Sequence, residues 1–134
     1  MDPSHARGRA RLIRQRLLER VADADTRHLT IAGEDGVWQP WLDGVQIKVL
    51  REQGEVLSYL LRLAPGARLP PHRHPQDEEC IVIEGHLRIG THEPFGPGSY
   101  HLAHGGTLHA SISTDTGATI FLRGAEPQAD QLLG

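Results

Sequence analysis

Hydrophobic and polar positions divide the chain into two regions with different periodicities. In residues 9–22, RARLIRQRLLERVA, apolar side chains recur at spacings of three to five among good helix formers. From Val37 onward, short β-prone runs alternate apolar and polar residues, and in VQIKVL the side chains of Val45, Ile47 and Val49 share one face. Turn-forming pairs that contain glycine separate these runs. The pattern predicts a short amphipathic α-helix and then about eight or nine short strands, as in a sandwich or barrel.

Length and composition fit one domain with a modest core. The chain has 134 residues, of which 38% are hydrophobic and only 4% aromatic, so Val, Ile and Leu must fill the core. A chain of this size buries roughly two-thirds of the surface that its unfolded state exposes. We expect residues 1–30 to form a flexible lead (1–8) and the helix, residues 31–125 to form a β-barrel, and residues 126–134 to form a C-terminal tail.

Charge and cysteine content limit which partners and which cellular compartment we expect. Residues 1–28 hold seven arginines and four acids, whereas residues 29–134 hold seven basic and thirteen acidic residues. An acidic domain is not expected to bind nucleic acid, because the phosphate backbone repels it. No apolar run is long enough to span a membrane, and the N-terminus lacks the apolar core of a signal peptide. With Cys80 as the single cysteine, we expect a cytoplasmic protein without membrane or nucleic-acid partners.

The stretch GARLPPHRHPQDEECIVIEG carries the candidate chemistry. In an extended chain, residues of equal parity point to one face, so we expect His72, His74 and Glu78 to point inward together. A buried carboxylate beside histidines is costly unless a cation holds them together. Two imidazoles and a carboxylate suit zinc, iron, manganese, nickel or cobalt. His109, in the second half of the chain, is the candidate for a fourth ligand.

Other side chains are expected near this cluster. Cys80 shares the inward face of the candidate ligands, so it is either a small buried apolar residue or part of a pocket beside the metal, with a redox role as an alternative. His101 and His104 either orient the ligand imidazoles, as outer partners of metal sites do, or lie in a surface loop. Trp38 and Trp41 flank a proline and either cap an open barrel end or contact a substrate.

The same stretch resembles the first motif of the cupin superfamily. That motif consists of a glycine, five residues, His-x-His, three residues, a glutamate, six residues and a glycine. The matching residues are Gly66, His72, His74, Glu78 and Gly85. The resemblance implies a jelly-roll β-barrel, also called a double-stranded β-helix, which here follows a short N-terminal α-helix.

A second cupin motif resembles residues 98–113, with two departures. Gly98, Gly106 and His109 match the motif, whereas His104 stands where proline is usual and Ser113 where asparagine is usual. Neither departure replaces a ligand position. The resemblance therefore implies that one divalent metal ion is held inside the barrel by His72, His74, Glu78 and His109.

A narrower resemblance covers roughly residues 37–123. Segments such as LLRLAPGARLPPHRH, DEECIVIEG and PGSYHLAHGGTLHASIS are similar to the cupin-like domain of ChrR-type anti-sigma factors. In that family an N-terminal half with a His-x3-Cys-x2-Cys zinc motif binds the sigma factor. These 134 residues hold no such motif, so we expect the resemblance to extend to the sensory module and not to the sigma-binding module.

Two main functional hypotheses follow from these resemblances. The first is a regulatory or sensory module that holds one divalent metal and reports an oxidant or a small-molecule ligand to a regulatory protein partner, with the basic helix as a docking surface. Zinc is favoured, with Fe(II), manganese or nickel as alternatives, and cupins of this kind commonly form homodimers. The second is an Fe(II)-dependent dioxygenase acting on a small ketone or diketone. In a third reading the metal only stiffens a thin core.

Overall fold

The structure is a computed structural model that describes residues 3–24 and 27–127. The chain divides into two compact units, Met1–Ala32 and Gly33–Gly134. From position 128 onward, the predicted C-terminal tail lies outside the described residues. The predicted domain bounds at residues 30 and 125 therefore stay predictions.

The N-terminal unit contains one helix, α1 (Pro3–Ala24), in which no described residue is buried. It begins at Pro3 rather than at Arg9, so the predicted flexible lead is helical where the structure describes it. Proline is well tolerated in the first helical turn, because its missing N–H would have no helical partner there, and the alanines and arginines that follow favour a helix. None of the described helices is long and apolar enough to cross a membrane.

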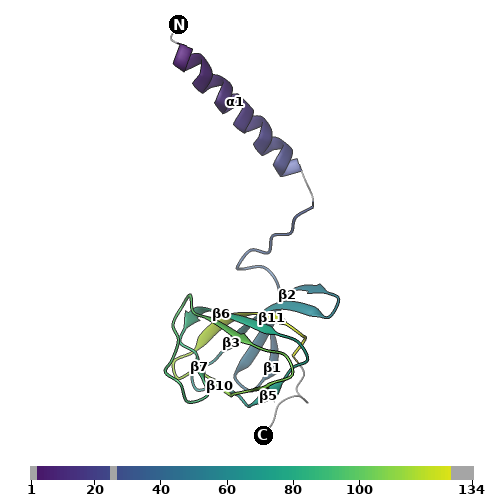
Figure 1. Ribbon diagram of the computed structural model, residues 1–134, viewed down its shortest axis with the longest axis vertical. Coiled ribbons are helices and arrows are strands. Elements are labelled where there is room, and N and C mark those ends of the chain that lie inside the picture. Colours follow the sequence, from purple (N-terminus) through teal and green to yellow (C-terminus); the bar gives the residue numbers. More distant parts are fainter. Residues whose placement is uncertain (1–2, 25–26, 128–134) are drawn as a thin grey trace. The chain divides into compact units, whose positions relative to one another are not determined.

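The second unit is built from strands (Figure 1). In chain order these are β1 (Gln39–Leu42), β2 (Val45–Gln53), β3 (Val56–Leu63), β4 (Arg68–Leu69), β5 (His72–Arg73), β6 (Glu78–Gly85), β7 (Arg88–Ile89), β8 (Tyr100–Ala103), β9 (Leu108–His109), β10 (Ile112–Ser113) and β11 (Ala118–Gly124). Each β-prone run of the sequence overlaps at least one strand, so the all-β prediction is confirmed for this unit. The run RLPPHRH is divided into β4 and β5, because the two prolines between them lack the N–H that strand pairing needs.

The strands pair in three antiparallel sheets. A six-stranded sheet has the order β1-β2-β3-β11-β6-β8, a three-stranded sheet has the order β4-β10-β7, and β5 pairs with β9. Figure 1 shows β3, β11 and β6 side by side in the larger sheet. Because the described strands pair as separate sheets and not as one continuous sheet, closure into a jelly-roll barrel stays a prediction.

The hydrophobic core lies on one face of the six-stranded sheet. Alternate residues of β3, β6 and β11 are buried, and the strand register sets Ile120 between Leu61 and Val82. Burying one such aliphatic side chain contributes about 1.5–3 kcal/mol to stability. The same alternation turns Tyr59 and Glu78 to the buried face, so the polar site grows out of the core pattern.

Two loops are fastened together beside β5 and β9. The Gly105 N–H donates to Asp77 Oδ1 at 2.9 Å, and the Gly106 N–H donates to the His74 carbonyl at 2.9 Å. A Cβ atom on Gly105 would lie 2.7 Å from the Gln76 backbone, so only glycine permits this close approach. The contact brings the chain that leads to His109 against the turn that leads to Glu78.

Candidate metal centre

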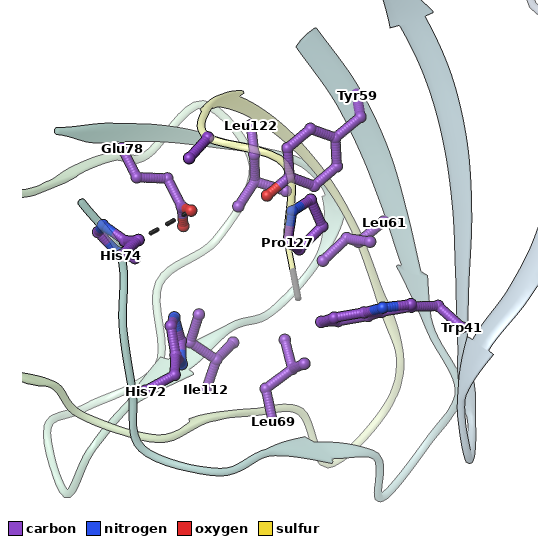
Figure 2. A pocket seen from close by; sticks show the side chains of 11 residues that line it. Trp41, Tyr59, Leu61, Leu69, His72, His74, Glu78, Ile112, Leu122 and Pro127 are labelled. Carbon is purple, nitrogen blue, oxygen red and sulfur yellow. Dashed lines mark ion pairs between the residues drawn. The ribbon is translucent and has the colours of Figure 1, made fainter. Parts of the chain in front are cut away.

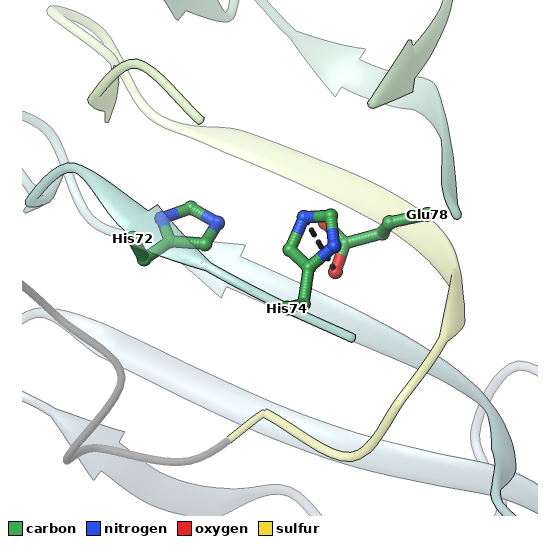
Figure 3. Close-up of side chains that lie close together, drawn as sticks. All are labelled: His72, His74 and Glu78. Carbon is green, nitrogen blue, oxygen red and sulfur yellow. Dashed lines mark ion pairs between the residues drawn. The ribbon is translucent and has the colours of Figure 1, made fainter. Parts of the chain in front are cut away.

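Three of the four predicted ligands gather in one place (Figure 3). His72 lies on β5, Glu78 is the first residue of β6, and His74 lies in the turn between them. One ligand atom from each side chain lies within 4.8 Å of the other two. His74 and Glu78 are buried, whereas the neighbouring Glu79 is half-buried and points to the opposite face of β6.

The hydrogen bonds of the histidines define where their lone pairs lie. His72 Nδ1 lies 3.0 Å from the Pro70 carbonyl, His74 Nδ1 lies 2.8 Å from the Gln76 carbonyl, and His109 Nδ1 lies 2.6 Å from the Ala110 carbonyl. A carbonyl oxygen only accepts, so each Nδ1 must be the donor. In a neutral imidazole the lone pair then resides on Nε2, which is the form that binds a metal. Backbone contacts thus leave the Nε2 lone pair of each neutral ring available for a metal.

The Nε2 atom of His74 is the decisive observation at this site. It is buried and, among the described residues, no hydrogen-bond partner lies within reach of it. The nearest charged atom is Glu78 Oε2 at 3.9 Å, a distance at which a cation can sit between the two atoms but a hydrogen bond cannot form (Figure 3). A buried acceptor without a donor is costly, and a bound cation removes that cost. The donor set therefore fits a divalent metal.

His109 lies beside both histidines of the three-residue group. Antiparallel pairing of β5 with β9 sets it directly opposite His72, and the two rings stack with centroids 4.7 Å apart. Its ring centroid lies 6.0 Å from that of His74. Burial lowers the pKa of His109 to about 4, so its imidazole is neutral near pH 7. Its participation as a fourth ligand stays a prediction, because it falls outside the group whose ligand atoms meet.

Tyr59 is a site residue that the sequence analysis did not identify. It lies on β3, is 1% exposed, and its hydroxyl is hydrogen-bonded to the Glu78 carboxylate. Burial raises the pKa of Glu78, while the two neighbouring histidines and the Tyr59 hydroxyl oppose that rise. The signal in the sequence was a tyrosine on the same face of the segment EVLSYLLRL as Leu57 and Leu61, where a buried polar group needs a partner.

A cavity opens beside the three candidate ligands (Figure 2). Its empty space of about 430 Å³ includes open solvent at the mouth, and the enclosed part is small. Its wall consists of Trp41, Tyr59, Leu61, Leu69, His72, His74, Glu78, Ile112, Leu122, Ala125 and Pro127. Apart from the ligands, this wall is mainly apolar. Trp41 therefore contacts the cavity, whereas Trp38 instead lies under Arg62, whose guanidinium carbon is 3.9 Å from the ring centroid.

The structure separates the other predicted neighbours of the metal. Cys80 is buried, and burial raises the pKa of its thiol to about 12, but it is not part of the cavity wall. His101 is half-buried and meets the His109 ring edge-on at 5.2 Å, and burial lowers the pKa of His101. His104 is exposed, 3.9 Å from Asp77 Oδ1, as the surface-loop alternative describes. Of the three, only His101 touches a predicted ligand ring.

Comparison with known proteins identifies the family. Residues 26–126 match the model of the ChrR Cupin-like domain. The chain belongs to that family. No curated protein matches the chain. The cupin fold, mostly β-sheet with one N-terminal helix, is therefore shown for this protein.

Solved structures agree with this assignment. A chain in the crystal structure of Rhodobacter sphaeroides SigE in complex with the anti-sigma ChrR is 27% identical with a TM-score of 0.59, and the match covers 71% of this protein and 51% of that chain. KdgF from Halomonas sp. is 20% identical with a TM-score of 0.61, over 78% of this protein and 99% of that one. An acetylacetone dioxygenase from Acinetobacter johnsonii is 12% identical with a TM-score of 0.64, over 82% and 83%. The last two likenesses show the fold alone, and this protein spans about half of the ChrR-complex chain.

Proposed function

We propose that this protein is a metal-binding regulatory module of the ChrR type, folded as a jelly-roll barrel. One divalent metal ion, with zinc favoured, is held by His72, His74, Glu78 and His109. The partnerless buried Nε2 of His74 carries this proposal, since a cation is the simplest partner for it. The three Nδ1–H groups held by backbone carbonyls support it, because they leave each Nε2 lone pair for the metal.

The residues of the proposed metal centre have different roles. The histidines and Glu78 hold the metal, which when bound supplies a Lewis-acidic position for a ligand oxygen. Tyr59 holds the carboxylate of Glu78, and His101 packs against the ring of His109. The cavity marks the side from which a small molecule or an oxidant would reach the metal and change its surroundings.

We further propose that the module acts through a regulatory protein partner, as a homodimer, in the cytoplasm. The partner is supported by the ChrR Cupin-like family match and by a similar chain that was solved as a complex of SigE with the anti-sigma ChrR. The single buried cysteine suits a reducing compartment. If the proposal holds, a stoichiometric protein partner co-purifies with the wild-type chain from native lysate and is lost with His74→Ala. Repeated isolation of the chain without any partner would count against a regulatory role.

Elemental analysis of untagged protein, purified without oxygen from its native host, tests the metal centre. Near-stoichiometric zinc is expected in the wild type and in His92→Ala, which removes an exposed histidine outside the site. His74→Ala is expected to lose the metal. Absence of metal from all three proteins, or equal metal in all three, would refute the site.

An Fe(II)-dependent dioxygenase acting on a small ketone or diketone is the second candidate function. The observation that favours it is the mainly apolar cavity wall beside the ligands, which suits a small apolar substrate with one metal-binding oxygen. The acetylacetone dioxygenase of the same fold supports the substrate class only by analogy. Near-stoichiometric iron together with oxygen consumption across a panel of ketones is the result that this function requires. Zinc-loaded protein without turnover would exclude it.

A further inference from the structure

The outer face of the six-stranded sheet carries a row of apolar side chains in strand register. Leu60, Phe121, Ile81 and Tyr100 lie opposite one another on β3, β11, β6 and β8. The first three alternate with buried residues, so they point away from the core. Ile81 is 40% exposed and Tyr100 is 56% exposed. Leu60 and Phe121 are half-buried, and an apolar row that partly faces water is typical of an interaction surface.

A pair of opposite charges lies beside this apolar row. Arg123 on β11 is directly opposite Glu79 on β6, at the same height along the strands. Glu79 accepts a hydrogen bond of 2.9 Å from the Tyr100 hydroxyl, which holds the carboxylate against the face. The basic group therefore belongs to one strand and the acidic group to its neighbour, each two residues along from an apolar side chain of the row.

One end of the row is already covered by the chain itself. Lys48 on β2 lies opposite Leu60 in the register, yet it is only 3% exposed. Its ammonium group donates to the Gly33 carbonyl at 3.2 Å and lies 6.0 Å from the centroid of the Trp38 ring. The segment that begins at Gly33 thus covers Lys48 on β2, and the open part of the apolar row lies on β3, β11, β6 and β8.

We propose that this open face is the contact surface of a homodimer, with the two-fold axis parallel to the strands and above the boundary between β11 and β6. Such an axis sets β11 over β6 of the partner subunit at the same height. Phe121 then packs on Ile81 of the partner subunit, and Arg123 meets Glu79 of the partner subunit. Two sheets that pack face to face lie about 10 Å apart, a distance that side chains of this size bridge.

The arrangement of charges on this face is the reason to propose a second copy of the chain as the binding partner. A two-fold contact requires a face that is complementary to itself: if one residue contacts a second residue of the partner subunit, that second residue also contacts the first residue of the partner subunit. Because Arg123 and Glu79 stand at one height on adjacent strands, rotation about the strand direction exchanges them, and each copy offers an arginine to the other's glutamate. A face with one sign of charge would repel its copy. The inference names the surface of the homodimer proposed above and rests on that homodimer alone.

Charge reversal in the full-length chain tests this surface. Glu79→Arg and Arg123→Glu each place like charges opposite one another in both halves of the contact. For each variant alone, sedimentation velocity is expected to show a dimer dissociation constant at least tenfold higher than that of the wild type. An equimolar mixture of the two variants restores opposite charges in every pair and is expected to form a heterodimer. Arg68→Glu, an exposed change on β4 in another sheet, is the matched control and should stay dimeric.

Each outcome decides the proposal. A monomeric wild type, a dimer that survives both reversals, or a mixture that fails to reassociate would each overturn it. Circular dichroism and metal content of each variant show whether it is folded and loaded, so failure of the dimer is distinguished from failure of the metal centre. If either reversal does not fold, Tyr100→Glu, at a more exposed position of the row, replaces it with the same expected dissociation.

Discussion

Replacing Tyr59 by phenylalanine removes one buried hydroxyl and leaves the ring that packs in the core. Because Tyr59 is 1% exposed, the substitution removes a buried hydrogen-bond partner of Glu78. A hydrogen bond to a charged group contributes about 1.5–3 kcal/mol, which corresponds to roughly a 10- to 100-fold change in an equilibrium constant. The hydroxyl lowers the pKa of Glu78, so its loss makes the buried carboxyl hold its proton more strongly. A metal must displace that proton, and we expect the affinity to fall by about one to two orders of magnitude.

The assay for this change is competition with a chromophoric chelator, with zinc and with cobalt, at several pH values. Tyr59→Phe should bind both metals more weakly, should show a steeper gain in affinity as pH rises, and should shift the visible spectrum of bound cobalt. Tyr100→Phe is the matched control, because that tyrosine also donates to a glutamate, at 2.9 Å, but on the exposed outer face. An affinity for Tyr59→Phe within twofold of the wild type, with an unchanged cobalt spectrum, would refute the role assigned to this hydroxyl.

Three further predictions concern stability. Burial lowers the pKa of His109 from 6.5 to about 4, so as pH falls the unfolded chain takes up this proton before the folded chain does. The metal-free protein should therefore have its full stability above pH 6.5 and lose stability as pH falls toward 4. The urea midpoints at pH 7 and pH 5 should differ less for His109→Gln than for the wild type. Gly105→Ala sets a Cβ 2.7 Å from the Gln76 backbone and should lower stability by about 1–3 kcal/mol in urea unfolding, unlike Gly33→Ala, where the added atom meets nothing. Chelation should lower the melting temperature of the wild type but leave that of His74→Ala unchanged, and equal shifts would contradict metal binding.

The strands of this protein were predictable because their pattern is local. Alternation in VQIKVL and EVLSYLLRL depends only on neighbours two apart, and both runs are strands in the structure. The helix start was predicted too late, because helix propensity was not extended back through Gly8 to Pro3. Closure of the sheets into a barrel depends on contacts between distant strands, and no local pattern encodes it.

The candidate site divides in the same way. His72, His74 and Glu78 could be placed on one side from the sequence, because a short extended segment and one turn set their directions. The carbonyl partner of each Nδ1 atom could not be predicted from the sequence, since it depends on how each imidazole ring is oriented in the folded chain. Tyr59 was missed because β3 reaches Glu78 only through the packing of the sheet, two strands away.

The sequence by itself determined the family, the strand-rich unit and the three clustered candidate ligands, since motif spacing and alternation act over a few residues. Only the tertiary structure decided that His109 faces His72, that His74 Nε2 is buried without a partner, and that Arg123 stands beside Glu79 on a water-facing surface. Each of these depends on which strands become neighbours and in what register. That choice is made by burial of the whole core, where Ile120 between Leu61 and Val82 sets the alignment that the polar groups follow.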